Sequence, residues 1–465
     1  MQLAEAKRAE IAYRRDHYWN AGQAAERLRL LLPERRAFFT PLALAGRLKP
    51  PVLEIGAEFG LNSMILENDF GLTTVSLDLS RRSLQASTIV ARVLGMDAPT
   101  PLVAADAERL PFQQASFGTV ILWGTLAHFA DPTTLLAEAG RVLAEDGTLV
   151  VADTPIRRRL QWPIWRAPKV EHVYGWRRWL LKLGILPFVA RIGGKEEVEQ
   201  GVVLHEWSPE DFEALFTGYQ NRRVMYRPLW PSGGLTAGPL ARALWSGRDL
   251  VDQFGGIAAA TMTKPMPLRR VGRDHWVAKK HPRHDRMALR GFSGAFMCEG
   301  VPLTATDESV SLPPSTVGRS TIVLQIPRDF MRIDFWDSND ETELTSHFPA
   351  QPPRIDPLAS LACPECVQFT DRCVFGFCNT ECIAACPHDA LEPTHASLPV
   401  KTSCDGCGAC LRACPYGGLD RPPIREDRCV ECRHEIVAND YIVEARPRHL
   451  RESLDLANLE RVVLF

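Results

Sequence analysis

Short runs of apolar residues alternate with segments of helical spacing between about residues 50 and 263. The runs at 52–55, 74–77 and 102–105 have the length of strands, and helix-like stretches separate them. Strands that alternate with helices in this way predict βαβ units and a parallel sheet, so the fold class is α/β. We expect the run at 257–263 to be the closing strand of this domain.

Two proline-containing linkers follow, at residues 264–286 and 347–357. Prolines spaced in this way interrupt regular structure. Between the linkers, the apolar run 321–326 and the alternating run 331–335 predict two strands. A small β-rich connecting module is therefore expected over residues 287–346.

A chain of 465 residues with 45% apolar content is expected to form two or three domains, each with its own core. The predicted boundaries are 1–265 for the α/β domain with a helical N-terminal extension, 287–346 for the β-rich module, 358–440 for a cysteine-rich domain and 441–465 for a C-terminal tail.

The net charge of −2 gives the whole chain no long-range attraction to nucleic acid or to a membrane. The first 50 residues have mixed charge and lack the apolar segment of a signal peptide, and no apolar run reaches membrane-spanning length. We therefore expect a cytoplasmic protein. In a reducing compartment, closely spaced cysteines are metal ligands more often than disulfides.

Polar and glycine residues stand where the predicted strands end. Gly56 and Gly60 follow the first strand, Asp78 ends the second and Asp106 ends the third. Glycines at a strand-to-helix turn let the backbone approach a ligand, and a carboxylate after the next strand is placed to bind a ribose. The three strand ends predict one ligand-binding crevice.

Residues Val52 to Thr154 resemble the core of a class I S-adenosylmethionine-dependent methyltransferase, a Rossmann-like fold. The resemblance covers about a quarter of the chain and lies in the order of features: the turn Glu54-x-Gly56, Asp78, the segment Asp106 to Phe112, Ser116-Phe117, His128, and the segment Arg141 to Asp153. It implies that Glu54 and the backbone from Gly56 to Gly60 face the methionine part of the cofactor. It also implies that Asp78 binds the ribose and that Asp106 and Ala107 bind the adenine.

Two residues bear on whether this domain is active. The family usually has a second glycine where this chain has Glu58, whose side chain adds bulk and negative charge beside the cofactor's carboxylate. The domain is accordingly either a cofactor-binding enzyme or a scaffold that keeps the fold. His128, after the fourth strand, is a candidate catalytic base, with a packing role as the alternative.

An insert over residues 156–195 carries ten lysines or arginines, four tryptophans and a single acid, Glu171. One interpretation is a lid over the substrate pocket. Another is an interfacial helix that makes peripheral contact with anionic lipid. The insert is also suited to an acidic partner, whereas nothing elsewhere in the chain supports nucleic acid.

Twelve of the thirteen cysteines lie between Cys363 and Cys432. The run from Cys404 to Cys414 has the spacing C-x2-C-x2-C-x3-C followed by proline, which is the ligand spacing of bacterial-type ferredoxins with two [4Fe-4S] clusters. The pattern C-x3-C-P at Cys382 recurs 28 residues later at Cys410, so the domain contains a repeat.

In two-cluster ferredoxins the fourth cysteine of each motif binds the other cluster. This resemblance implies two ligand sets. Cluster I would be held by Cys386, Cys404, Cys407 and Cys410. Cluster II would be held by Cys373, Cys378, Cys382 and Cys414, with Cys363 or Cys366 as alternatives for its first two ligands.

Two C-x2-C pairs lie on either side of the repeat, and they are Cys363 with Cys366 and Cys429 with Cys432. Paired knuckles of this kind form tetrahedral sites for zinc or a single iron. A third iron-sulfur cluster and metal-free thiols are the alternatives. A metal here would fasten the two ends of the cysteine-rich domain together.

The sequence thus predicts a methyltransferase coupled to an iron-sulfur electron-transfer domain. The alternative is a non-catalytic methyltransferase-like scaffold that serves as a binding and electron-transfer component of a redox complex. Both interpretations require a redox partner protein. The small-molecule methyl acceptor is not indicated by any motif.

Overall fold

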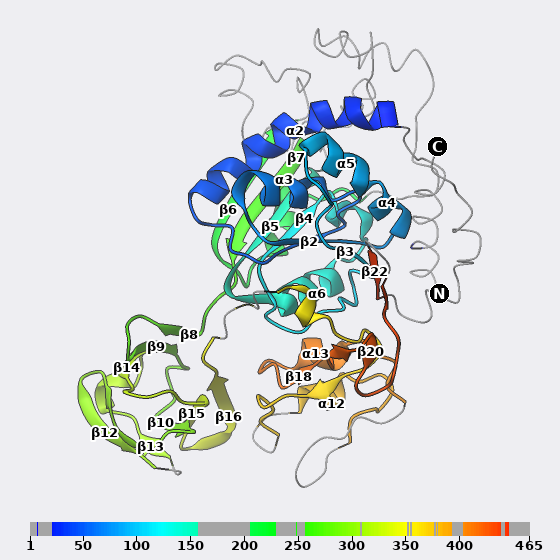
Figure 1. Ribbon diagram of the computed structural model, residues 1–465. Helices are drawn as coiled ribbons and strands as arrows, with labels where there is room; N and C mark the ends of the chain where they lie inside the picture. The colour runs from blue at the N-terminus through cyan, green and yellow to red at the C-terminus, as the bar shows by residue number, and fades with distance from the viewer. Residues whose placement is uncertain are drawn as a thin grey trace, which may run out of the picture.

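The computed structural model describes residues 7, 21–156, 205–228, 248, 256–306, 309–350, 353, 356–375, 378, 380–392, 403–438 and 442–445. From residue 157 onward, the basic, tryptophan-rich insert lies outside the described residues. Figure 1 shows three parts: a large sheet with helices, a β-rich module and a cysteine-rich domain below helix α6.

A nine-stranded sheet forms the largest part, in the order β21-β22-β3-β2-β1-β4-β5-β7-β6. Strands β1 to β5 are parallel, and β7 is antiparallel to its two neighbours. This is the predicted Rossmann-like α/β fold. The strands are β1 (Val52–Ile55), β2 (Thr74–Asp78), β3 (Leu102–Ala104), β4 (Phe117–Trp123), β5 (Leu143–Ile156), β6 (Gln220–Pro228), β7 (Gly256–Thr263), β21 (Val437–Ala438) and β22 (Ile442–Glu444).

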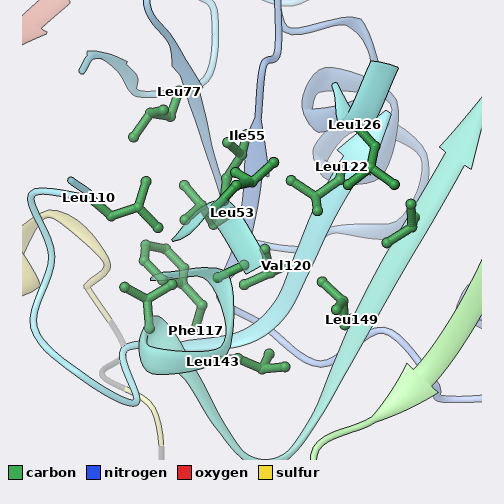
Figure 2. Packing of buried hydrophobic residues seen from close by; sticks show 14 of the residues in the cluster. Leu53, Ile55, Leu77, Leu110, Phe117, Val120, Leu122, Leu126, Leu143 and Leu149 are labelled. Carbon is green, nitrogen blue, oxygen red and sulfur yellow. The ribbon is translucent and has the colours of Figure 1, made fainter. Parts of the chain in front are cut away.

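Alternate residues of the central strands bury apolar side chains on both faces of the sheet. Figure 2 shows Leu53, Ile55, Val120, Leu122 and Leu149 of β1, β4 and β5 pointing into one cluster, and all five are fully buried. Full burial of such a side chain contributes about 1.5–3 kcal/mol. This period of two is what fixes the sheet's position between its helices.

Helices cover both faces of the sheet. Apolar residues of α6 and α9 pack into the cluster of Figure 2, while α2, α3 and α5 pack together on the opposite face. The predicted N-terminal helix is α2. No described helix is long and apolar enough to cross a membrane. The helices are α2 (Ala21–Leu44), α3 (Leu61–Phe70), α4 (Arg81–Gln85), α5 (Ser87–Leu94), the short helix η1 (Leu126–His128), α6 (Thr133–Val142) and α9 (Pro209–Ala214).

The strand β22 comes from the far end of the chain and extends the sheet beyond β3. Ile442 pairs in parallel with Leu102, and the amide of Ala445 donates to the carbonyl of Ala104 at 2.9 Å. Residues Ile442–Glu444 of the C-terminal tail expected over 441–465 therefore form a strand of the first domain's sheet, between β3 and the edge strand β21.

The β-rich module consists of two antiparallel sheets around a core of its own. It begins at Leu268, earlier than the predicted 287, because β8 and β9 pair with its strands. Cys298, outside the cysteine-rich domain, is buried in this core. The elements are β8 (Leu268–Arg270), β9 (His275–Lys279), β10 (Arg286–Arg290), β11 (Gly294–Cys298), β12 (Val301–Ala305), β13 (Val310–Ser311), η3 (Pro314–Thr316), β14 (Thr321–Gln325), β15 (Arg332–Asp337) and β16 (Asp340–His347).

The cysteine-rich domain packs against α6 and the segment before β4 (Figure 1). Phe112 forms an antiparallel bridge with Leu361, and the amide of Ala362 donates to the carbonyl of Pro111. The domain's elements are η4 (Leu358–Ser360), β17 (Gln368–Phe369), α12 (Glu381–Ala384), α13 (Ala409–Ala413), β18 (Leu419–Asp420), β19 (Ile424–Arg425) and β20 (Arg428–Cys429).

Candidate functional site

The turn between β1 and α3 brings backbone close to the neighbouring strand ends. Gly56 has a φ of 71°, and a Cβ atom there would lie 2.9 Å from Thr125 Cγ2. Gly60 has a φ of 72°, and its Cβ would lie 2.7 Å from Ser76 Oγ. Glycine alone satisfies both the left-handed conformation and the close approach. Packing therefore explains both predicted glycines.

Glu58 also has a left-handed backbone, with a φ of 54°. Its amide donates to Asp78 Oδ2 at 2.8 Å. The turn thus keeps a conformation natural to glycine although a glutamate occupies it, at a cost of about 1–2 kcal/mol. With glutamate at this position, the backbone amide still donates the hydrogen bond that joins the turn to Asp78 at the end of β2.

The carboxylate of Asp78 is fixed at the end of β2 by two backbone amides. Besides the bond from Glu58, Oδ1 accepts from the amide of Ser80 at 2.8 Å. Ser80 in turn caps α4, since its hydroxyl accepts from the amide of Ser83. Asp78 is therefore held in one orientation beside the β1–α3 turn, where the sequence predicted a ribose ligand.

Glu54 lies inside the protein beneath that turn. Its carboxylate accepts hydrogen bonds from Asn62 Nδ2 at 2.6 Å and from the amide and hydroxyl of Ser63 at 2.9 and 2.7 Å. Burial raises the pKa of Glu54. Glu54 thus anchors the first turn of α3, so it can act on a cofactor through the shape of the turn.

Asp106 follows β3 and is almost fully buried. Its Oδ2 accepts from Lys7 Nζ at 2.7 Å, and Oδ1 accepts from the amide of Glu108 at 3.0 Å. Lys7 also pairs with the carboxylate of Glu108 at 2.5 Å. Burial opposes the charge of Lys7, yet the two carboxylates raise its pKa overall. Sequence reasoning missed Lys7, which donates to Asp106 as the adenine amino group was expected to do.

The other two predicted residues lie near the same edge of the sheet. Ala107 directly follows Asp106 and is partly buried. His128 is the last residue of η1, which follows β4, and its amide donates to the carbonyl of Thr125 at 3.1 Å. His128 thus comes from a strand end next to β1, and its role as a base stays a prediction.

Four cysteines of the predicted cluster I line one pocket together with His388 and Asp405. Burial raises the pKa of Cys410 to about 12, and the nearby sulfurs of Cys404, Cys407 and Cys386 add to the shift. Thiols that repel one another's ionisation in this way suit a cationic metal centre, which binds them as thiolates.

The cysteines of the predicted cluster II also lie near one another. Burial raises the pKa of Cys382 to about 11, and the sulfurs of Cys414, Cys378 and Cys373 contribute to the same effect. Cys373 and Cys414 are far apart in sequence, so the fold brings this set together.

The internal repeat is visible in the hydrogen bonds to sulfur. Cys386 Sγ accepts from the amide of Ala390 at 3.2 Å, and Cys414 Sγ accepts from the amide of Gly418 at 3.3 Å. The two short helices α12 and α13 begin 28 residues apart and pack against each other. The two halves are therefore structural equivalents.

The outer cysteine pairs meet in a tight group. Cys363 Sγ lies 3.6 Å from Cys432 Sγ, and Cys366 Sγ lies 3.4 Å from Cys429 Sγ. All four sulfurs are within 4.8 Å of one another. A tetrahedral ion with metal–sulfur bonds of about 2.3 Å spaces its ligands by about 3.8 Å. The group thus has the dimensions of a site for one metal ion.

The two outer knuckles have matching backbone geometry. The amide of Glu365 donates to Cys363 Sγ, and that of Glu431 donates to Cys429 Sγ, both at 3.3 Å. Hydrogen bonds with the neighbouring thiols of Cys363 and Cys429 raise the pKa of Cys366. Amide donors of this kind stabilise thiolates bound to a metal.

Comparison with known proteins places the first domain. A family model described as a methyltransferase domain matches residues 53–151. The chain is 28% identical over 109 residues to the methyltransferase GfsG of Streptomyces halstedii, which is 23% of this chain and 39% of that protein. It is 42% identical over 62 residues to a tetrathionate reductase subunit from Archaeoglobus fulgidus, which is 12% of this chain and 30% of that protein.

Among solved structures, geranyl diphosphate C-methyltransferase from Streptomyces coelicolor is similar with a TM-score of 0.33 and 13% identity, over 51% of this chain and 80% of that chain. The chain spans only 30% to 39% of the length of the two relatives above. Residues 53–151, which the methyltransferase-domain model matches, lie within a mixed α/β chain whose C-terminal region is rich in strands.

Proposed function

We propose that the chain is an S-adenosylmethionine-dependent methyltransferase whose cysteine-rich domain carries two [4Fe-4S] clusters for electron transfer. The observation that carries the methyltransferase half is the grouping of the glycine turn, Asp78 and Asp106 at one edge of the sheet, inside the region that the methyltransferase family model matches. Open α/β sheets bind ligands at this edge.

The residues of this edge suit the parts of S-adenosylmethionine. The backbone from Gly56 to Gly60 would face the methionine part, Asp78 would accept hydrogen bonds from the ribose hydroxyls, and Asp106 would accept from the adenine amino group. When bound, the cofactor supplies a methyl group activated by its sulfonium charge. Binding in this way requires Lys7 to leave Asp106 or to share it.

Once the cofactor is bound, this chain's residues have to orient the methyl acceptor and remove its proton. His128, near the end of β4, is the candidate base for a proton on an acceptor atom. Positioning alone supports a large part of such a reaction. The insert, from residue 157 onward, lies outside the described residues, and the composition of its arginines and tryptophans suits a lid, an acidic partner or a membrane surface.

The iron-sulfur half rests on the four-thiol groupings and their repeat. Cys386, Cys404, Cys407 and Cys410 would hold cluster I, while the equivalent set in the other half would hold cluster II. Electrons would pass to or from a partner protein. The similarity to part of a tetrathionate reductase favours a redox role for part of the chain.

The outer cysteine group would hold a single zinc or iron ion. Sulfur separations of 3.4 and 3.6 Å favour one metal ion over a third cluster, whose four irons would spread the ligands more widely. The ion would join the knuckle that opens the cysteine-rich domain to the knuckle that leads into β21 and β22.

The contact between Lys7 and Asp106 favours a second candidate function. A lysine already bound where adenine was expected is compatible with a methyltransferase-like scaffold that binds no cofactor and serves an electron-transfer complex. The two functions differ in one property, which is the affinity for S-adenosylmethionine.

Calorimetric titration of the full chain, purified without oxygen, tests the proposal. The full chain is needed because β22 completes the sheet next to β3. We expect one molecule bound per chain, and Asp78→Ala to weaken binding about 10-fold to 100-fold through loss of hydrogen bonds to a charged group. Asp97→Ala, at an exposed acid beyond α5, is the matched control. A flat trace for the wild-type chain would favour the scaffold.

A further inference from the structure

We propose that Arg421 of the cysteine-rich domain is a positioning residue for the cofactor-binding segment Asp106–Phe112, so that cofactor affinity depends on the metal-loaded state of the cysteine-rich domain. This inference rests on the proposed function and adds a coupling between its two halves.

Arg421 is a fully buried arginine that contacts three parts of the molecule. One terminal nitrogen, Nη1, donates to the carbonyl of Pro364 at 2.9 Å and to that of Gly406 at 3.3 Å. The other, Nη2, lies 3.6 Å from Glu138 Oε2. Pro364 belongs to the outer metal knuckle, Gly406 to the loop of cluster I and Glu138 to helix α6 of the methyltransferase domain.

Both carbonyls that Arg421 holds lie between metal-binding cysteines. Pro364 stands between Cys363 and Cys366, and Gly406 stands between Cys404 and Cys407. The two loops are packed tightly, since a Cβ atom on Gly406 would lie only 2.6 Å from Glu365 Cα. The position of the guanidinium is therefore set by two loops that the proposed metals would hold in shape.

From Arg421, the contacts continue to the cofactor segment through Glu138. Glu138 is also fully buried, and its Oε2 accepts from the amide of Leu110 at 3.0 Å. Arg141, one turn along α6, bonds Glu138 and donates to the carbonyls of Leu110 and Phe112 at 3.1 and 2.7 Å. The backbone of this segment is thus held by buried charges.

Leu110 lies only four residues beyond Asp106. Within that stretch, the amides of Glu108 and Arg109 donate to Asp106 itself, one to the side chain and one to the carbonyl. A shift of Leu110 would therefore rotate or displace the carboxylate predicted to bind adenine.

The charges of this network balance. Glu138 and Asp420 face Arg141 and Arg421, and the Arg141–Asp420 pair lies at 3.2 Å. Removing Arg421 leaves two buried carboxylates with one cation, and a buried network with an uncompensated charge rearranges or takes up water. The rearrangement would move the carboxylate of Glu138 and, through its hydrogen bond, the backbone of Leu110.

The first test compares Arg421→Gln with Arg421→Lys and with the control Arg425→Gln, an exposed arginine four residues away. Affinity for S-adenosylmethionine is measured by calorimetry, with iron content and melting temperature recorded for each full-length variant. We expect Arg421→Gln to bind at least about fivefold more weakly with its iron retained, Arg421→Lys to fall between, and the control to match the wild type. Equal affinity of wild type and Arg421→Gln overturns the inference. If Arg421→Gln does not fold, Arg421→Lys decides by the same comparison.

The second test removes the metals with a chelator and repeats the titration. Metal removal should weaken binding in the wild-type chain and have little further effect in Arg421→Gln, because the coupling is already lost there. Equal weakening in both chains, or none in the wild type, contradicts the role of Arg421. A wild-type chain that binds no S-adenosylmethionine before treatment would instead sink the proposed function together with this inference.

Discussion

Replacing Gly56 by alanine tests the β1–α3 turn most sharply. The residue has a φ of 71°, which costs an alanine about 1–2 kcal/mol. The added Cβ would lie 2.9 Å from Thr125 Cγ2 and closer still to Oγ1, which donates to the carbonyl of Ile55 at 2.7 Å. Moving Thr125 aside would cost about 1 kcal/mol for that hydrogen bond and about 1–3 kcal/mol for overpacking.

The expected total is about 3–6 kcal/mol, a large part of a domain's stability. For a domain of this size, at about 2–4 °C per kcal/mol, we expect the melting temperature to fall by roughly 6–24 °C, measured by circular dichroism. Gly46→Ala is the matched control, because Gly46 has a φ of 64° but no atom within 4 Å of an added Cβ. Gly46→Ala should lose only the stability that the left-handed backbone conformation costs an alanine, about 1–2 kcal/mol. An equal drop in both variants would refute the packing explanation.

Three further predictions concern other parts of the chain. Glu58→Gly should relieve the strain of the left-handed backbone at residue 58 and tighten S-adenosylmethionine binding, measured by calorimetry. Weaker binding in this variant would mean that the glutamate side chain contributes to cofactor affinity. Burial lowers the pKa of Lys264 to about 8, so the unfolded state binds the proton more tightly and stability should rise by about 3 kcal/mol between pH 8 and 10.5. Urea titrations of Lys264→Met should lack that rise, and an equal rise would refute the assignment. Cys429→Ser should remove one metal ion per chain and speed hydrogen exchange in β3, whereas Cys298→Ala should leave the metal content unchanged; identical metal content in both variants would contradict the outer site.

The hydrophobic pattern was enough to predict the central fold. The runs at 52–55, 74–77 and 102–105 correspond to β1, β2 and β3, and their residues are buried on both faces of the sheet. Strand β22 was missed, since three residues, Ile442–Glu444, carry too little periodicity to stand out. Its place depends on pairing with a strand more than 300 residues away.

The candidate site was predictable where spacing encodes chemistry. Cysteine spacing predicted a four-thiol group from the two C-x2-C pairs, and the four cysteines of these pairs do lie together. No spacing revealed the contact from Lys7 to Asp106 or the buried Arg421, since each joins segments from separate parts of the chain. Spacing also did not reveal that the carboxylate of Glu54, within β1, bonds Asn62 and Ser63 inside the protein. Its role toward a cofactor stays a prediction.

The proposed function requires that one chain combines a methyltransferase domain with an iron-sulfur domain. The most direct test of this combination is chemical analysis of iron and acid-labile sulfide in full-length protein purified without oxygen. Two [4Fe-4S] clusters predict roughly eight iron and eight sulfide per chain, with broad absorbance at about 400 nm. A ninth iron or one zinc would report the outer site. Zinc without sulfide, or no metal, would contradict the account.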